Sequence, residues 1–194
     1  MRRQPQGRAW AARKHPATPM ASGRRKLLAV ALAGIVASAC GRPGSTSAER
    51  RQDAPVVDSI SDGDSFIARL PDGRRIGVRI AGIDAPEKDQ PWADAARSYL
   101  TQALGRESLQ IEPLKTDPFG RQVAVVRTGD EDVGLMLVRA GLAWHFVRYA
   151  ADQSAEDRAA YALAEREART ARRGLWADPA PVAPWVHRQR QRGG

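Results

Sequence analysis

Strand-like patterns of apolar and polar residues open the part of the chain that follows residue 54. Residues 56–60 are rich in β-branched side chains, and residues 65–70 and 75–80 alternate between apolar and polar positions, which predicts three strands. Asp72-Gly73, between the second and third segments, is typical of a hairpin turn. The third segment places its isoleucine and valine side chains on one face, so Arg79 is expected to point away from the core.

Helix-like spacing of apolar residues becomes common after residue 90, and a glycine follows each helical segment. The predicted elements of this part are a helix over residues 92–104, strands at 109–111 and 123–126, a helix between Asp132 as its cap and Gly141, and a helix over 155–173. Five strands, one inserted helix and later helices predict an α+β protein, namely a five-stranded OB-fold barrel with flanking helices.

Candidate chemistry is concentrated in three short segments. They are Asp62-Gly63-Asp64, then Arg79 followed by Asp84-Ala85-Pro86-Glu87, then Asp117-Pro118-Phe119-Gly120-Arg121. Carboxylate oxygens bind hard cations such as Ca²⁺, and arginine forks match phosphate oxygens bidentately. A further carboxylate near a metal can take a proton from water. An Asp-Gly turn or an acidic loop alone is common on any surface, so the prediction depends on all three segments occurring together.

In order and spacing, these segments resemble the staphylococcal-type (thermonuclease) nuclease family over about residues 55–176. The resemblance implies a Ca²⁺-dependent phosphodiesterase that cleaves the 5′-O–P bond of DNA and RNA and leaves 3′-phosphates. It further implies a role for each candidate residue. Asp64, Asp84 and the backbone carbonyl of Ala85 would hold the metal, Glu87 would position or deprotonate the attacking water, and Arg79 and Arg121 would clamp the phosphate.

Some positions depart from the family pattern. Ala85 stands where the best-known members have threonine, which keeps a carbonyl but removes a hydroxyl. Phe119 follows Pro118 where the family has Lys-Tyr; it can stack on a base or sugar but donates no hydrogen bond. Tyr149 matches a position near the nucleotide-binding face. We therefore treat Phe119 and Tyr149 as candidate substrate-binding residues.

Other residues near these segments favour a structural reading. His145 lies between two aromatic residues, and the family uses no histidine there, so we expect a structural role. Leu175 and Trp176 belong to a segment that resembles the family's closing motif, and packing in the core is the expected role of both. Asp62 is expected to be a turn residue that supports Asp64.

The charge of the chain is unevenly distributed. The formal net charge is +9, but residues 1–40 hold eight basic residues and no acidic ones. Residues 54–178 hold 17 basic and 20 acidic residues, a net charge of −3. Non-specific binding of nucleic acid normally needs several Lys or Arg contacts to phosphate. A metal ion and local arginines would have to hold the substrate here.

The N-terminal segment resembles an export signal. Residues 27–36 form an apolar run after Arg24-Arg25-Lys26, too short to span a bilayer comfortably but typical of a signal peptide. Ala37-Ser38-Ala39 reads as a cleavage site, and together with Cys40 it also resembles a lipobox. A lipoprotein tethered to the membrane through Cys40 and a secreted protein are equally compatible with this segment. Twin-arginine export and an uncleaved anchor are weaker alternatives, and translation from Met20 is a further hypothesis.

The expected organisation is a targeting segment over residues 1–40, a linker over 41–53, a nuclease domain over 54–178 and a Pro/Arg-rich tail over 179–194. A solvated tail is favoured over one that touches nucleic acid or membrane. Cys40 is the only cysteine, so an intrachain disulfide is excluded. We expect an exported monomer, with a non-catalytic OB-fold module that binds nucleic acid or protein as the alternative function.

Overall fold

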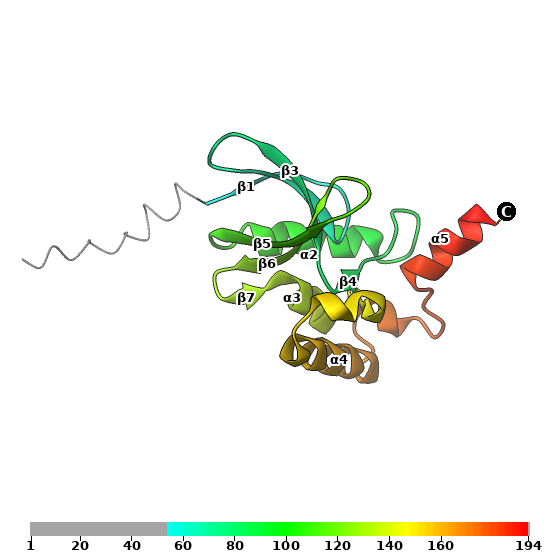
Figure 1. Ribbon diagram of the computed structural model, residues 1–194. Helices are drawn as coiled ribbons and strands as arrows, with labels where there is room; N and C mark the ends of the chain where they lie inside the picture. The colour runs from blue at the N-terminus through cyan, green and yellow to red at the C-terminus, as the bar shows by residue number, and fades with distance from the viewer. Residues whose placement is uncertain (1–53, 194) are drawn as a thin grey trace, which may run out of the picture. The chain divides into compact units, whose positions relative to one another are not determined.

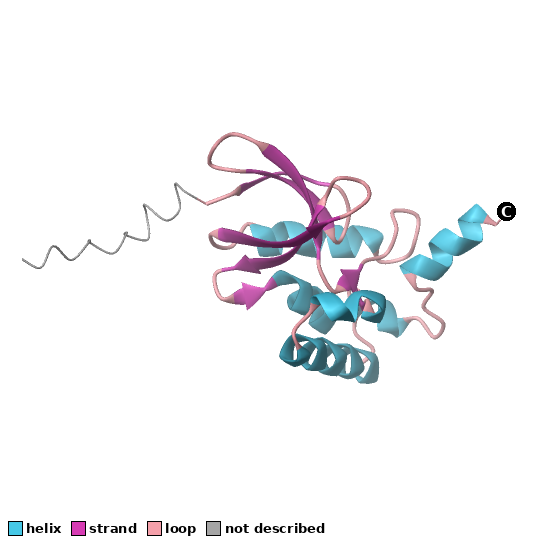
Figure 2. Ribbon diagram, viewed as in Figure 1, coloured by secondary structure: helices cyan, strands magenta, loops and turns pink. Residues whose placement is uncertain are grey.

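The computed structural model describes residues 54–193, and its main sheet has the hydrogen-bonded order β1-β2-β3-β6-β5, with β7 beside β6. Neighbouring strands are antiparallel except β3 and β6, which run parallel. Figures 1 and 2 show this sheet with the helices packed beside it. The six strands are β1 Val56–Ile60, β2 Ser65–Arg69, β3 Arg75–Ile80, β5 Leu109–Thr116, β6 Gln122–Thr128 and β7 Glu131–Asp132.

The α+β class and the five main strands are confirmed, but closure of the sheet into a barrel is not. Within residues 54–193, β1 and β5 lie at opposite ends of the hydrogen-bonded order and do not pair with each other. Each of these edge strands has an irregular register, between Val57 and Ser59 in β1 and between Pro113 and Lys115 in β5. Such irregularities interrupt ladder pairing at sheet edges. β5 also extends to Thr116, beyond its predicted end.

Within residues 54–193, four α-helices and two 3₁₀ helices accompany the sheet. They are α2 Ala93–Leu104, α3 Val133–Ala140, η1 Val147–Asp152, α4 Ala155–Thr170, η2 Gly174–Ala177 and α5 Pro184–Arg192. The predicted caps of α3 are confirmed, because Asp132 accepts the Leu135 N–H at 3.1 Å and Gly141 follows with φ 71°. α4 ends before its predicted limit, since Arg172 adopts a left-handed backbone.

The core lies between the sheet and the helices α2 and α3. Phe66, Val78, Leu100 and Leu137 are all at most 1% exposed. Alternation along β3 buries Val78 and Ile80. The same alternation directs the neighbouring Arg79 away from the core, as predicted.

A second, two-stranded sheet connects the main sheet to the later helices. β4 Ile83–Asp84 pairs antiparallel with β8 Trp144–His145, with Asp84 opposite Trp144. This short pairing fixes the backbone of Asp84 just beyond the end of β3.

The segment after residue 178 differs from the expected solvated tail. Helix α5 begins with the buried Pro184, and the Trp185 ring stacks on Phe146 at 5.2 Å between centroids. The Trp185 ring also meets the edge of Trp144 at 5.5 Å. These apolar contacts dock the helix, which a count of its prolines and arginines did not reveal.

Candidate active site

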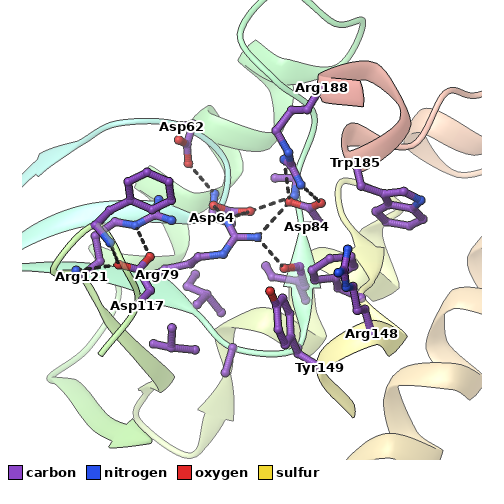
Figure 3. A pocket seen from close by; sticks show the side chains of 18 of the residues that line it. Asp62, Asp64, Arg79, Asp84, Asp117, Arg121, Arg148, Tyr149, Trp185 and Arg188 are labelled. Atoms are coloured by element: carbon purple, nitrogen blue, oxygen red, sulfur yellow. Dashed lines mark hydrogen bonds and ion pairs between the residues drawn. The ribbon is translucent and has the colours of Figure 1, made fainter. Parts of the chain in front are cut away.

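The first part of the site is built by the pairing of β2 with β3. Ser65 lies opposite Arg79 in this ladder, which brings Asp64, the residue before β2, beside the end of β3. Arg79 Nη1 donates to both carboxylate oxygens of Asp64, at 2.9 and 3.0 Å. Arg79 Nη2 donates to Asp84 Oδ1 at 2.9 Å. One guanidinium therefore joins two aspartates from different elements, as Figure 3 shows.

Both aspartates are buried, with Asp64 3% and Asp84 0% exposed. Burial raises the pKa of Asp84, and the neighbouring charge of Asp64 adds to that rise, against hydrogen bonds from arginine. Burial opposes the charge of Arg79, yet the pKa of its guanidinium is raised because Asp64 and Asp84 favour the charged form. The site thus concentrates negative charge that requires cations close by.

Asp62 and Gly63 hold this turn in place. The Asp64 N–H donates to Asp62 Oδ1 at 3.0 Å, the supporting role expected for Asp62. Burial, followed by the charge of Asp64, raises the pKa of Asp62 to about 6. A Cβ at Gly63 would lie 2.7 Å from the Ala96 Cβ and 2.8 Å from the Ala85 Cβ. The turn therefore packs directly against α2 and against the loop that carries Ala85.

Arg121 is fixed by the loop that precedes it. Asp117 Oδ2 accepts Arg121 Nε at 2.8 Å, and Asp117 Oδ1 accepts the backbone N–H groups of Phe119 and Arg121, both at 2.9 Å. Burial disfavours the charge of Asp117, but these donors hold its pKa below the ordinary value. Arg121 Nη1 also donates to Ser65 Oγ at 3.2 Å, and that hydroxyl donates to Asp64 Oδ1 at 2.7 Å. Ser65 thus links the second arginine to the aspartate pair.

Glu87 lies in the loop after β4, held by Gln90. The Glu87 N–H donates to Gln90 Oε1 at 2.9 Å, and the Gln90 N–H donates back to the Glu87 carbonyl at 2.8 Å. Gln90 Nε2 donates to the Val182 carbonyl at 2.9 Å, which ties this loop to the segment before α5. The loop also contacts Asp64 directly, because the Ala85 N–H donates to Asp64 Oδ2 at 3.0 Å.

Arg188 of α5 is a site residue that our reading of the sequence missed. Its Nη2 donates to Asp84 Oδ2 at 2.7 Å and its Nη1 to Asp84 Oδ1 at 3.2 Å, while Nη1 also binds Glu87 Oε1. Figure 3 shows this side chain reaching Asp84 from α5, while Arg79 approaches from the sheet. Alternating arginines at 188, 190 and 192 were the only signal, and it does not single out one of them.

One cleft of about 940 Å³ is lined by the main charged residues of the site, namely Asp62, Asp64, Arg79, Asp84, Glu87, Arg121 and Arg188. Phe119 and Tyr149 both line it and are 82% and 47% exposed. Lys115 Nζ lies 4.7 Å from the centre of the Tyr149 ring, so a cation and an aromatic face are presented together. This combination suits the backbone and bases of a single strand.

The three residues that were expected to have structural roles are buried. His145 is buried, and its Nε2 lies 3.0 Å from Gln153 Oε1. Leu175 and Trp176 are 3% and 7% exposed, as expected for core residues. None of these three residues lines the cleft.

The carboxylate oxygens of the cleft suit a hard cation, although in this structure arginines contact them. Residues 54–193 contain no group of three or more His, Cys, Asp or Glu side chains arranged around one metal position. Arg79 lies between Asp64 and Asp84, and Arg188 lies between Asp84 and Glu87. The three carboxylates supply the oxygen ligands that Ca²⁺ prefers, so the residue types fit this ion. The metal role of the Ala85 carbonyl stays a prediction.

The targeting predictions, including Cys40 and the alternative start at Met20, fall outside the described residues. Within residues 54–193, no helix has the length and apolar character needed to cross a bilayer.

Comparisons with a family profile and with individual known proteins point to the same family. The profile of the staphylococcal nuclease homologue family matches residues 77–178. An uncharacterized endonuclease of Haemophilus influenzae is 31% identical over 170 residues, which cover 87% of this chain and 88% of that protein. An uncharacterized endonuclease of Escherichia coli O157:H7 is 31% identical over 134 residues, or 68% of this chain and 82% of the relative.

Longer plant proteins are similar to part of this chain. The probable staphylococcal-like nuclease CAN2 of Oryza sativa subsp. japonica is 37% identical over 119 residues, which are 61% of this chain. That match spans only 31% of the plant protein, so the chain corresponds to about a third of it.

Proposed function

Since this chain belongs to the staphylococcal nuclease homologue family, we propose that it is a Ca²⁺-dependent nuclease that hydrolyses phosphodiester bonds in DNA and RNA. The observation that carries the proposal is the Arg79 guanidinium bound to both Asp64 and Asp84, with Arg121 connected to Asp64 through Ser65. Three carboxylates and two arginines from separate segments of the sequence therefore meet in one cleft.

In this proposal, Asp64, Asp84 and the Ala85 carbonyl would hold the cation. When bound, a divalent cation of this kind supplies Lewis-acid polarisation of a phosphoryl oxygen. Glu87 orients a water molecule and takes its proton as the water oxygen attacks phosphorus. The bond from phosphorus to the 5′-oxygen then breaks, the leaving oxygen takes up a proton from solvent water, and a 3′-phosphate remains.

The arginines act on the charge of the phosphate. Arg121 is held at its Nε by Asp117, which leaves the guanidinium facing the cleft. Arg79 keeps its position through Asp64 and Asp84. Each guanidinium donates to non-bridging phosphate oxygens on which negative charge accumulates during the reaction, an effect worth about 3–4 kcal/mol per donor. Phe119 and Tyr149 stack on bases or sugars at the rim of the cleft.

The test is cleavage of single-stranded DNA and RNA by the purified chain, with Ca²⁺ and with EDTA. We expect cleavage only with Ca²⁺. Arg121→Ala and Glu87→Ala should each lower kcat by about 10²- to 10³-fold, while far-UV circular dichroism stays unchanged. Arg97→Ala on α2 and Glu112→Ala on β5 change exposed residues away from the cleft and should keep full activity. A folded protein that binds DNA but cleaves nothing under either condition would favour the non-catalytic binding module.

We further propose that the protein acts as a monomer outside the cytoplasm, exported by its N-terminal segment. The basic residues, apolar run and Ala-Ser-Ala-Cys sequence before residue 41 support the export. Mass spectrometry of the mature protein would distinguish a lipid on Cys40 from a free, secreted form. An intact N-terminus at Met1 or Met20 in the mature protein would contradict cleavage.

A further inference from the structure

Helix α5 lies beyond residues 77–178, the segment that matches the family profile, and yet it reaches the centre of the cleft. The helix contributes Trp185, Arg188, Gln189 and Arg192 to the lining of the cleft. Only Arg188 among them contacts the carboxylates to which we assign the cation and the water. The position of this one side chain therefore affects the proposed reaction directly.

The Arg188 guanidinium uses the oxygens that a cation and its water would need. Both oxygens of Asp84 accept from it, at 3.2 and 2.7 Å, and Glu87 Oε1 accepts from it as well. Asp84 Oδ1 already accepts Arg79 Nη2 at 2.9 Å. A carboxylate has about four lone-pair positions. With two arginines bound, Asp84 has little capacity left for a further positive partner.

The backbone of α5, rather than chance rotation of one side chain, sets the place of Arg188. Trp185, three residues earlier, is packed on Phe146 and Trp144. His187 Nε2 lies 3.0 Å from Asp89 Oδ1, and Gln191 Nε2 donates to Asp89 Oδ2 at 2.8 Å. These two contacts lie at the surface and contribute little, so the docking depends largely on the buried Pro184 and on the aromatic contacts of Trp185. Such an attachment can be released without unfolding the sheet.

We propose that Arg188 is a built-in competitor of the catalytic cation: α5 docks with Arg188 on Asp84 and Glu87, and the cation binds these carboxylates only when Arg188 leaves them. The proposal depends on the function proposed above, because it takes these carboxylates to be cation ligands. Only molecules in which α5 is undocked then bind the cation. The apparent dissociation constant for the cation is the intrinsic constant divided by the fraction of such molecules. By linkage, cation binding must equally weaken the docking of α5.

The first test is titration of Ca²⁺ alone into the metal-free, full-length chain by isothermal titration calorimetry. Arg188→Gln should lower the dissociation constant for Ca²⁺ by about tenfold or more. Arg190→Gln is the matched control, since Arg190 is exposed on the same helix and does not line the cleft. It removes the same charge at nearly the same place and should change the constant less than about twofold.

The second test follows the helix itself by hydrogen exchange of residues 184–192. In the wild type, saturating Ca²⁺ should accelerate exchange in this segment. In Arg188→Gln, adding Ca²⁺ should change exchange in this segment little, because the guanidinium that couples docking to cation binding is gone. Exchange in α5 that stays equally slow with and without saturating Ca²⁺ in the wild type would overturn the competition.

The outcomes separate this inference from the nuclease assignment. If the wild type binds Ca²⁺ and cleaves DNA but Arg188→Gln has the same Ca²⁺ affinity, the competition is wrong and the nuclease assignment stands. If Arg188→Gln lowers turnover at saturating Ca²⁺ without changing affinity, Arg188 contacts substrate, and the competition is again wrong. If neither protein binds Ca²⁺ and EDTA leaves cleavage unchanged, the cation assignment fails and the competition fails with it.

Discussion

Arg79 and Arg188 bind the same carboxylate of Asp84, but the protein holds them in different ways. Arg79 belongs to β3, in the interior of the sheet between β2 and β6, and its side chain is 18% exposed. Arg188 belongs to the last helix, and its side chain is 32% exposed. The Asp84 side chain between them is 1% exposed. One partner is therefore part of the folded sheet, and the other arrives on an element docked at the edge of the site.

This difference suits two distinct tasks. Buried carboxylates need a permanent positive partner, because an uncompensated buried charge destabilises the fold by several kcal/mol. A cation site also needs a positive partner that can leave the carboxylates when the cation binds. Arg79 meets the first requirement and Arg188 the second. The contrast predicts that the two arginines, equal in charge, have very different effects on stability and on ion affinity.

The largest expected effect is that of Arg79→Met on stability. Removing this guanidinium leaves Asp64 and Asp84 buried with fewer positive partners, so the free energy of unfolding in EDTA should fall by about 3–5 kcal/mol. Arg188→Met removes a partly exposed partner from an aspartate that Arg79 still binds, and should change stability by less than about 1 kcal/mol. Urea unfolding followed by circular dichroism measures both values.

Equal losses of unfolding free energy in Arg79→Met and Arg188→Met would contradict this difference between the two arginines. They would mean that α5 is as integral to the fold as β3. Arg97→Met, an exposed arginine of α2, controls for the loss of one positive charge and should unfold close to the wild type.

Gly63→Ala, on the sheet side of the site, should destabilise the protein less than Arg79→Met does. The added Cβ would lie 2.7 Å from the Ala96 Cβ and 2.8 Å from the Ala85 Cβ, so α2 or the Ala85 loop must shift. Overpacking of this kind costs about 1–3 kcal/mol, and the shift should also reduce turnover by moving Asp64. Gly105→Ala is the control, because its nearest neighbour would be the Thr101 carbonyl at 3.5 Å. Wild-type stability in Gly63→Ala would show that the turn is not tightly packed.

The parts of the fold that could be predicted from the sequence are those with local patterns. Alternation in β3 predicted the buried Val78 and the outward Arg79, and Asp132 and Gly141 marked the ends of α3. Their physical causes lie within a few residues of each other, which is why the sequence reveals them.

The parts that could not be predicted depend on contacts between distant segments. Arg188 and Asp84 are 104 residues apart, and Gln90 and Val182 are 92 apart. No local pattern shows that Trp185 finds Phe146, so the chain after residue 178 reads as a polar tail. Within residues 54–193 the sheet stays open, and this too depends on distant segments, because closure would require β1 to pair with β5.

The smallest expected effect concerns Asp62 and changes with pH. Its pKa is about 6 in the folded protein, because of burial and the adjacent charge of Asp64, and close to 3.9 in an unfolded chain. Above pH 6 the ionised carboxylate destabilises the fold. As the pH falls from 6 to 4, the folded state binds a proton that the unfolded state does not, so this penalty disappears.

Asp62→Asn keeps the acceptor for the Asp64 N–H but removes the charge. In EDTA at pH 7.5 the variant should be more stable than the wild type by about 1 kcal/mol, allowing for solvent screening of this half-buried group. The difference should shrink toward zero at pH 4. Asp130→Asn, at an exposed turn, should show no such narrowing. A stability gain for Asp62→Asn that is the same at pH 4 and pH 7.5 would mean that Asp62 does not carry the raised pKa.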